Sequence, residues 1–142
     1  MSKISDEIKN KMIKLALEIT KESYCPYSKY PVGAALLLDN DEIITGVNVE
    51  NASYGGTICA ERTAVVTAIT KGHRKFKGIA IATHGPTPSA PCGLCRQFMF
   101  EFGNMPVFLI TSKNNDIITT DLVELLPRGF GPHSLDEFNN HH

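Results

Sequence analysis

Three cysteines have the spacing of a metal site. Cys92 and Cys95 stand three residues apart in PCGLC, residues 91–95, so the first turn of a helix would place both on one face. Cys59 lies at the start of a second expected helix, in TICAERTAVV. Side chains in the first turn tilt toward the helix N-terminus, so two facing helix starts would bring the three sulfurs together. Three protein ligands leave tetrahedral zinc one open position, which is typical of a catalytic site.

Two other interpretations of the cysteines stay open. The PCxxC pair could be a redox motif, although thioredoxin-like motifs need no third cysteine. Cys25 has no ligand spacing in SYCPYS, and we expect it to be a small apolar residue in the interior. If Cys25 were a fourth ligand, the zinc would be structural and the chain would not be an enzyme.

Glu61 follows Cys59 by two residues, so the two side chains would not share a helix face. Glu61 is therefore poorly placed as a second ligand from this helix. We expect its carboxylate to reach the open position of the zinc and to act there as a general base and acid. The alternative is a first-turn glutamate that only favours the helix dipole.

Two arginines directly follow residues of this group, Arg62 after Glu61 and Arg96 after Cys95. Zinc with three thiolates carries a net charge of −1, which makes a bound water less acidic. We expect both arginines to donate hydrogen bonds to the sulfurs and to offset that charge. The alternative is two solvated surface arginines.

The pattern of apolar residues predicts the elements that position these groups. In order, they are a helix through 8–19, strands 32–38 and 43–47, a helix from a Thr57 cap to Lys71 stopped by Gly72, strand 78–83, a helix from Pro91 to Phe102 stopped by Gly103, strands 107–110 and 117–120, and a short helix at 121–127. This order predicts an α/β fold whose two strand–helix–strand units are parallel and right-handed. The last two strands are too close in sequence for a crossover, so we expect them to be antiparallel.

Length and composition fit one domain, residues 1–142, with a frayed tail at about 137–142. The chain is 42% hydrophobic and 20% charged, with a net charge of −1. This balance argues against binding to long nucleic acid. We find no membrane-spanning run and no signal peptide, so we expect a cytoplasmic location, where four cysteines favour metal binding or catalysis over disulfides.

Together these motifs resemble a known family. A CAE sequence followed by PCxxC is the pattern of zinc nucleoside and nucleobase deaminases. CAERTA, PCGLCRQ and NVENASY (residues 48–54) resemble the small cytidine deaminases in particular. The resemblance extends from YSKYPVGAALL to ELLPRGF and so covers most of the chain.

The resemblance implies a three-layer cytidine deaminase fold, a mixed five-stranded sheet flanked by helices, with one Zn²⁺ per chain. It implies a hydrolase of pyrimidine salvage that converts cytidine or deoxycytidine to uridine or deoxyuridine and ammonia. Glu61 would carry a proton from the zinc-bound water to N3 of cytosine and then to the leaving amino group. The family's homotetramer, with active sites shared between subunits, is expected as well.

The resemblance also implies a set of substrate-binding residues. Asn48 and Glu50 match residues that bind the ribose hydroxyls, and on an extended segment two such residues point the same way. Tyr30 matches an aromatic position, commonly phenylalanine, that packs by the pyrimidine. Ala52 and Tyr54 match residues that reach the sugar of a neighbouring subunit's substrate, and Phe130 matches an aromatic residue that covers the base from a neighbour. The full substrate-binding set is Asn48, Glu50, Ala52, Tyr54, Tyr30, Ala60 and Phe130.

Three alternative functions remain. A polynucleotide deaminase would have a helix before the last strand and a basic surface, which this sequence lacks. A blasticidin-type deaminase would share the zinc motifs and ELLP but not the complete NxENAxY. A structural zinc module that binds partners would need a fourth ligand and no Glu61. His84 could line the pocket, although a solvent-facing loop position is the simpler expectation.

Overall fold

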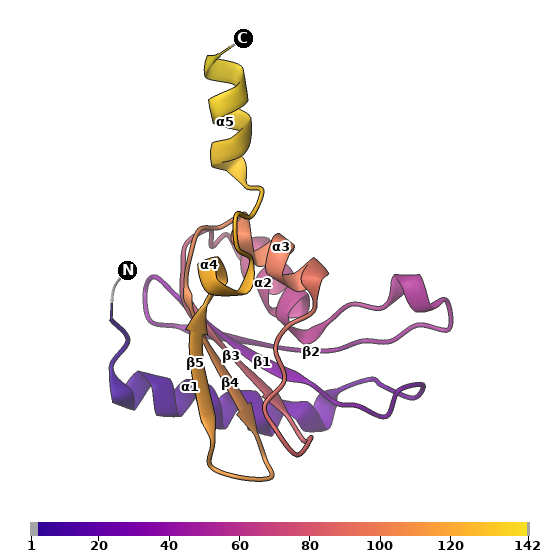
Figure 1. Cartoon of the computed structure of the whole chain (residues 1–142). Helices are drawn as coiled ribbons and strands as arrows, with labels where there is room; N and C mark the ends of the chain where they lie inside the picture. Colours follow the sequence, from indigo (N-terminus) through magenta and orange to yellow (C-terminus); the bar gives the residue numbers. More distant parts are fainter. Residues whose placement is uncertain (1–2, 142) are drawn as a thin grey trace.

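The computed structural model describes residues 3–141 and contains a mixed five-stranded sheet flanked by helices (Figure 1). In order, the elements are α1 (Asp6–Ile19), η1 (Thr20–Glu22), β1 (Gly33–Leu38), β2 (Ile43–Val47), η2 (Tyr54–Gly56), α2 (Ala60–Thr70), β3 (Phe76–Thr83), α3 (Gly93–Phe100), β4 (Pro106–Thr111), β5 (Ile117–Asp121), α4 (Leu122–Leu125) and α5 (Pro132–Asn140). The α/β prediction is therefore confirmed.

The strands lie in the order β2-β1-β3-β4-β5. β3 and β4 are parallel, and the other neighbouring pairs are antiparallel. Because β2 and β3 are both antiparallel to β1, they run parallel to each other. The predicted parallel direction of both strand–helix–strand units is confirmed, and so is the antiparallel final pair.

Helices cover both faces of the sheet, with α1 on one face and α2 and α3 on the other (Figure 1). β1 is buried along its whole length, and its side chains alternate between the two faces. Ala35 and Leu37 pack with Met12 of α1, whereas Leu36 belongs to the core that contains Met99 of α3. The helices that carry the cysteines therefore lie on one face, and α1 supports the other.

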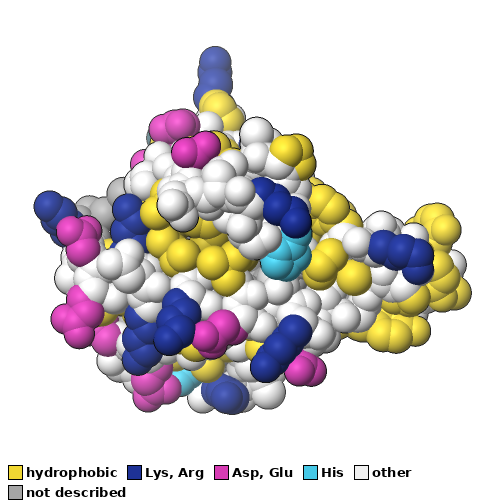
Figure 2. Space-filling model, turned by 90° about the horizontal axis from the view of Figure 1, so that it is seen from below, with side chains coloured by type: hydrophobic (Ala, Val, Ile, Leu, Met, Phe, Trp, Pro, Cys, Tyr) yellow, Lys and Arg dark blue, Asp and Glu magenta, His cyan; other side chains and the backbone are white. Residues whose placement is uncertain are grey.

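Residues 24–31 and 48–58 form an arm that extends beyond the sheet (Figure 1). Isolated bridges join its strands, because Val49 pairs with both Tyr24 and Ile58. Hydrophobic side chains gather at its end, where Tyr54 is 75% exposed (Figure 2). The arm thus connects β2 to α2 and presents apolar surface to solvent.

The two helix starts differ from the sequence prediction. Thr57 does not cap α2; it ends the η2 turn, and Cys59 is the N-cap. Pro91 is not the first residue of α3, because Cys92 is the N-cap and the helix begins at Gly93. In both cases an extended backbone continues two residues further than expected, so a cysteine itself occupies the cap.

The expected tail is largely helical. α5 continues through Asn140 and so includes part of the stretch 137–142 for which we expect fraying, while residue 142 lies outside the described part. Pro132 occupies the first helical turn, and the Ser134 hydroxyl accepts a hydrogen bond from the Gly131 N–H at 3.3 Å. α5 has no buried residue and projects from the body (Figure 1). No described helix is long and apolar enough to cross a membrane.

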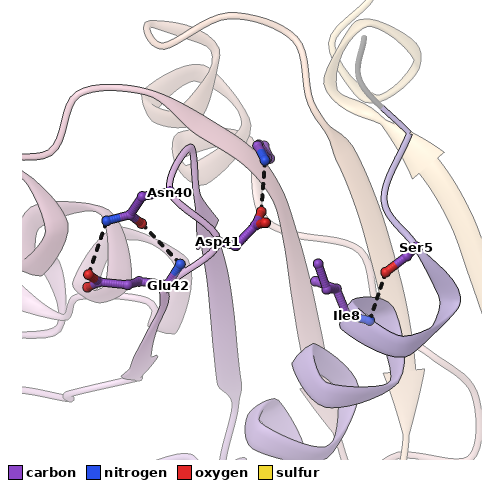
Figure 3. A network of polar contacts seen from close by, with 6 residues as sticks. Ser5, Ile8, Asn40, Asp41 and Glu42 are labelled. Carbon is purple, nitrogen blue, oxygen red and sulfur yellow. Dashed lines mark hydrogen bonds and ion pairs between the residues drawn. The ribbon is translucent and has the colours of Figure 1, made fainter.

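Local polar contacts hold the other end of the sheet (Figure 3). In the β1–β2 turn, Asp41 forms an ion pair with Lys77 at 2.7 Å, and the Asn40 amide donates to Glu42 at 3.0 Å. Ser5 caps α1 by accepting a hydrogen bond from the Ile8 N–H at 3.2 Å. These contacts fix the hairpin turn and the first turn of α1.

Gly46 allows α2 to approach β2 closely. A β-carbon on Gly46 would stand 2.5 Å from the backbone nitrogen of Ala64 and 2.6 Å from the carbonyl oxygen of Ala60. Both atoms belong to the helix backbone and cannot rotate away. The absence of a side chain at Gly46 therefore sets the height of α2 above the sheet, and with it the position of Cys59.

We expect Gly46→Ala to lower the free energy of unfolding by about 2 kcal/mol or more, because overpacking against backbone forces the helix to move. Gly55→Ala is the matched control, since a β-carbon there meets nothing within 4 Å. Urea denaturation of both variants measures the difference. Equal stability of the two variants would contradict the close approach.

Candidate active site

The three predicted cysteines come together. Their sulfur atoms all lie within 4.8 Å of one another, with Cys59 Sγ 3.8 Å from Cys92 Sγ and Cys92 Sγ 3.6 Å from Cys95 Sγ. Tetrahedral zinc with Zn–S bonds of about 2.3 Å requires sulfurs about 3.8 Å apart. The donor set and its spacing therefore fit zinc.

Two helix N-termini supply these sulfurs. Cys59 caps α2, Cys92 caps α3, and Cys95 lies in the first turn of α3. The unpaired N–H groups at helix starts favour negative charge, and thiolates are the form that binds metal. Within residues 3–141, no fourth histidine, cysteine or carboxylate joins the group, and Cys25 lies outside it. The fourth position of a bound zinc would thus be open.

The cysteine group already carries negative charge in the protein alone. Hydrogen bonding from Cys95, and also from Arg62, lowers the pKa of Cys59 to about 5. The pKa of Cys95 is raised, first because its thiol donates to Cys59 and then because it is buried. Metal binding would release the protons that remain on the thiols.

Arg62 and Arg96 make different contacts. Arg62 Nη2 lies 3.8 Å from Cys59 Sγ and 3.3 Å from the Thr57 carbonyl oxygen, as expected for a guanidinium beside the sulfurs. Arg96 does not donate to sulfur in this way; its Nε donates to the Pro91 carbonyl at 2.7 Å and its Nη1 to the Leu125 carbonyl at 2.8 Å. The expectation for Arg96 was wrong because its guanidinium bridges two backbone segments and so anchors the start of α3.

Glu61 lies in the first turn of α2 and is 3% exposed. It lines a cavity of about 390 Å³ together with Ala60, Cys59 and Cys92. Burial raises the pKa of its carboxyl, and the charge of Cys59 raises it further. A raised pKa makes the carboxyl a better proton acceptor than an exposed glutamate, which suits a proton carrier.

The cavity collects most of the predicted substrate residues. Its lining is Ser28, Tyr30, Val32, Asn48, Glu50, Thr57, Cys59, Ala60, Glu61, Ile81, Thr83, Ser89, Ala90, Pro91 and Cys92. Tyr54 lines an adjoining cavity of about 300 Å³ that shares Glu50. Ala52 and Phe130 line neither cavity, and Phe130 is 58% exposed.

Asn48 also holds the arm in place. Its Oδ1 accepts hydrogen bonds from the Val32 N–H at 3.0 Å and from the Ser23 hydroxyl, and its Nδ2 donates to the Tyr30 carbonyl at 2.8 Å. One amide hydrogen remains for a ligand. The side chain is 8% exposed, so its position is fixed by the protein.

Glu50 is likewise tied to the arm. Its Oε1 accepts hydrogen bonds from the backbone N–H groups of Tyr27 and Ser28, both at 3.0 Å, and its Oε2 accepts one from the Ser28 hydroxyl. Hydrogen bonding by the Ser28 side chain, then by its backbone, lowers the pKa of Glu50. The carboxylate is therefore ionised, and Glu50 lines both cavities.

Several lining residues were missed by the sequence analysis. Ser28 and Ser89 lie in loops that carried no spacing signal of their own. A signal did exist for Thr83, because alternation along β3 places it on the same face as Ile81. His84 does not line the cavity; its Nδ1 contacts the Ser112 hydroxyl at 2.5 Å and its Nε2 the Thr20 hydroxyl at 3.0 Å.

Comparison with known proteins identifies the family. The family model described as "Cytidine and deoxycytidylate deaminase zinc-binding region" matches residues 6–111, more than half of the chain and all three cysteines. The chain belongs to this deaminase family. The family description and the three-thiol group together identify zinc as the metal of the site.

The chain aligns with individual cytidine deaminases along most of their length. The chain is 44% identical over 127 residues to a cytidine deaminase of Sporosarcina psychrophila, covering 88% of this chain and 93% of the relative. It is 41% identical over 128 residues to a cytidine deaminase of Halalkalibacterium halodurans, covering 89% and 96%. The crystal structure of cytidine deaminase from Burkholderia pseudomallei superposes with a TM-score of 0.83 at 39% identity, covering 89% of this chain and 100% of that one. The predicted deaminase fold is confirmed.

We expect Cys59→Ser, Cys92→Ser and Cys95→Ser each to weaken zinc affinity by more than about 100-fold, because each removes a thiolate ligand. Cys25→Ser is the control and should keep its zinc, since Cys25 lies outside the group. Elemental analysis after dialysis against a chelator measures the zinc retained by the three ligand variants and by the control. Loss of zinc from Cys25→Ser would identify a fourth ligand and a structural site.

Proposed function

We propose that the chain is a zinc-dependent cytidine deaminase that hydrolyses cytidine, deoxycytidine or both to the corresponding uridine and ammonia in pyrimidine salvage. The observation that carries this proposal is the buried Glu61 carboxyl beside a three-thiol group in one cavity. A structural zinc module would have no use for a buried carboxyl at that point. The names of two relatives above 40% identity support cytidine as the substrate.

Cys59, Cys92 and Cys95 would hold the zinc, which when bound supplies an acidified water as the nucleophile. Glu61 accepts a proton from the attacking water and gives it to N3 of the cytosine ring. It then moves the remaining water proton from the oxygen on C4 to the amino group. The C4–N bond breaks, the C4 carbonyl forms, and the amino group leaves as ammonia. Burial of Glu61 favours this exchange because it raises the carboxyl pKa and so makes the carboxylate a stronger base.

Charge in the cavity favours a neutral nucleoside. Glu50 is ionised at the edge of the cavity, and neither lysine nor arginine is among the lining residues. A 5′-phosphate would therefore meet a carboxylate without a compensating cation. In our proposal the remaining Asn48 amide hydrogen and the Glu50 carboxylate bind the sugar hydroxyls, and Tyr30 packs beside the base.

We further propose a homotetramer in which Ala52, Tyr54 and Phe130 complete the sites of neighbouring subunits. The exposure of Tyr54 and Phe130 supports this, as does the absence of Ala52 and Phe130 from the lining of their own cavity. A cytoplasmic location is part of the proposal, since a reducing compartment keeps the ligand thiols from oxidising.

Glu61→Gln should lower kcat for cytidine by at least about 1,000-fold, because it removes the proton carrier, while one zinc per chain remains. Glu18→Gln is the control, because Glu18 is exposed on α1, across the sheet from the cavity. Loss of absorbance on conversion to uridine follows the reaction. Deoxycytidine, deoxycytidine 5′-monophosphate, blasticidin S and single-stranded DNA serve as parallel substrates, with the nucleosides preferred. Zinc-loaded wild type that turns over none of them would contradict the proposal and favour a structural zinc.

The shared site can be tested by mixing two inactive variants. Glu61→Gln subunits keep Phe130, and Phe130→Ala subunits keep Glu61, so mixed tetramers would regain complete sites. We expect an oligomer of about four times 15.6 kDa by sedimentation and more activity in the mixture than in the sum of its parts. A fully active monomer would contradict shared sites.

A further inference from the structure

One hydrogen bond joins the two walls of the cavity. The Tyr30 hydroxyl, on the arm, lies 2.8 Å from the Ser89 hydroxyl, on the loop between β3 and α3. Both residues line the cavity. The Tyr30 oxygen also lies 3.7 Å from the point where a β-carbon on Gly85 would stand. The phenol therefore reaches across to the loop and rests against it between residues 85 and 89.

The loop has few other attachments on this side. Its first residues are well held, because His84 contacts Thr20 and Ser112, and the Gly85 and Pro86 carbonyls accept hydrogen bonds from Thr111 and Asn114. Residues 87–90 form no other hydrogen bond within the described chain than that of Ser89 with Tyr30. Prolines at 86, 88 and 91 remove backbone donors that could replace it.

The arm offers a rigid support for this contact. The Tyr30 N–H donates to the Ser28 hydroxyl at 3.0 Å, and the Tyr30 carbonyl accepts from Asn48 Nδ2 at 2.8 Å. Ser28 is in turn bonded to Glu50. The backbone of Tyr30 is thus fixed on both sides, so its side chain is held in a defined position against the loop.

We propose that the Tyr30–Ser89 contact is a latch that holds residues 87–90 against the cavity, and that Tyr30 is a positioning residue for the base-binding wall. The loop carries Ala90 and Pro91, which line the cavity, and leads directly into Cys92. A phenylalanine at this position would keep the ring and lose the latch. The proposal rests on the proposed deaminase function for its kinetic consequence.

The latch contributes mainly to substrate binding. A single hydrogen bond of this kind changes an equilibrium by about 3- to 10-fold. Its loss would let Ser89 and Ala90 move away from the base, which weakens binding of substrate. Glu61 and the cysteines are held by α2 and by the first turn of α3, so the chemical step depends less on the latch.

Tyr30→Phe, Ser89→Ala and the double variant form the test, with Tyr24→Phe as the matched control. Tyr24 is also on the arm, is 57% exposed and does not line the cavity. We expect each single change to raise KM for cytidine by about 3- to 10-fold, with a change in kcat of less than about 2-fold. The double variant should be no worse than either single one, because both remove the same bond. Tyr24→Phe should match wild type.

Limited proteolysis provides a readout that needs no turnover. In zinc-loaded protein, Tyr30→Phe and Ser89→Ala should each speed cleavage by proteinase K within residues 84–90, and Tyr24→Phe should not. Unchanged cleavage in that segment, or KM effects that multiply in the double variant, would overturn the latch. Wild type without cytidine turnover would count against the deaminase function alone, and the proteolysis result would still decide the latch.

Discussion

The negative charge of three thiolates beside a buried carboxyl is the constraint on which the rest of the structure depends. Cys59 and Cys92 lie at helix N-termini, where unpaired N–H groups stabilise this negative charge. Arg62 adds a cation beside Cys59. Burial, and then the charge of Cys59, raises the pKa of Glu61 and so prepares that carboxyl to carry a proton.

The sheet order brings these helix starts together. β2, β3 and β4 run in one direction, so their carboxyl ends lie at one edge of the sheet. Asn48 follows β2, and Thr83 ends β3, which places both at this edge, where ligands commonly bind in α/β proteins. Small residues complete the arrangement, because Gly46 lets α2 lie directly on β2. The fold thus brings motifs that are far apart in the sequence together around one cavity.

The sequence predicted the cysteine group, the strands and the pairing directions, because these follow from spacing and periodicity within short segments. It did not predict that cysteines cap both helices, since the extended residues before them are fixed by the arm and the neighbouring loop. The contacts of Arg96 with Pro91 and Leu125 could not be predicted either, because Leu125 is 29 residues from Arg96 along the chain. The α5 helix was missed because its polar composition gives no buried stripe.

Asn48 and Glu50 bond to the arm with the amide nitrogen and the carboxylate oxygens through which we also propose that they recognise the sugar. A substitution at either position would therefore affect both sugar recognition and the structure of the arm. A lineage that drifted toward another sugar by changing either residue would also loosen the segment that carries Tyr30. Evolutionary adjustment of substrate preference is consequently easier at residues such as Thr83, whose side chain lines the cavity without holding any other segment in place.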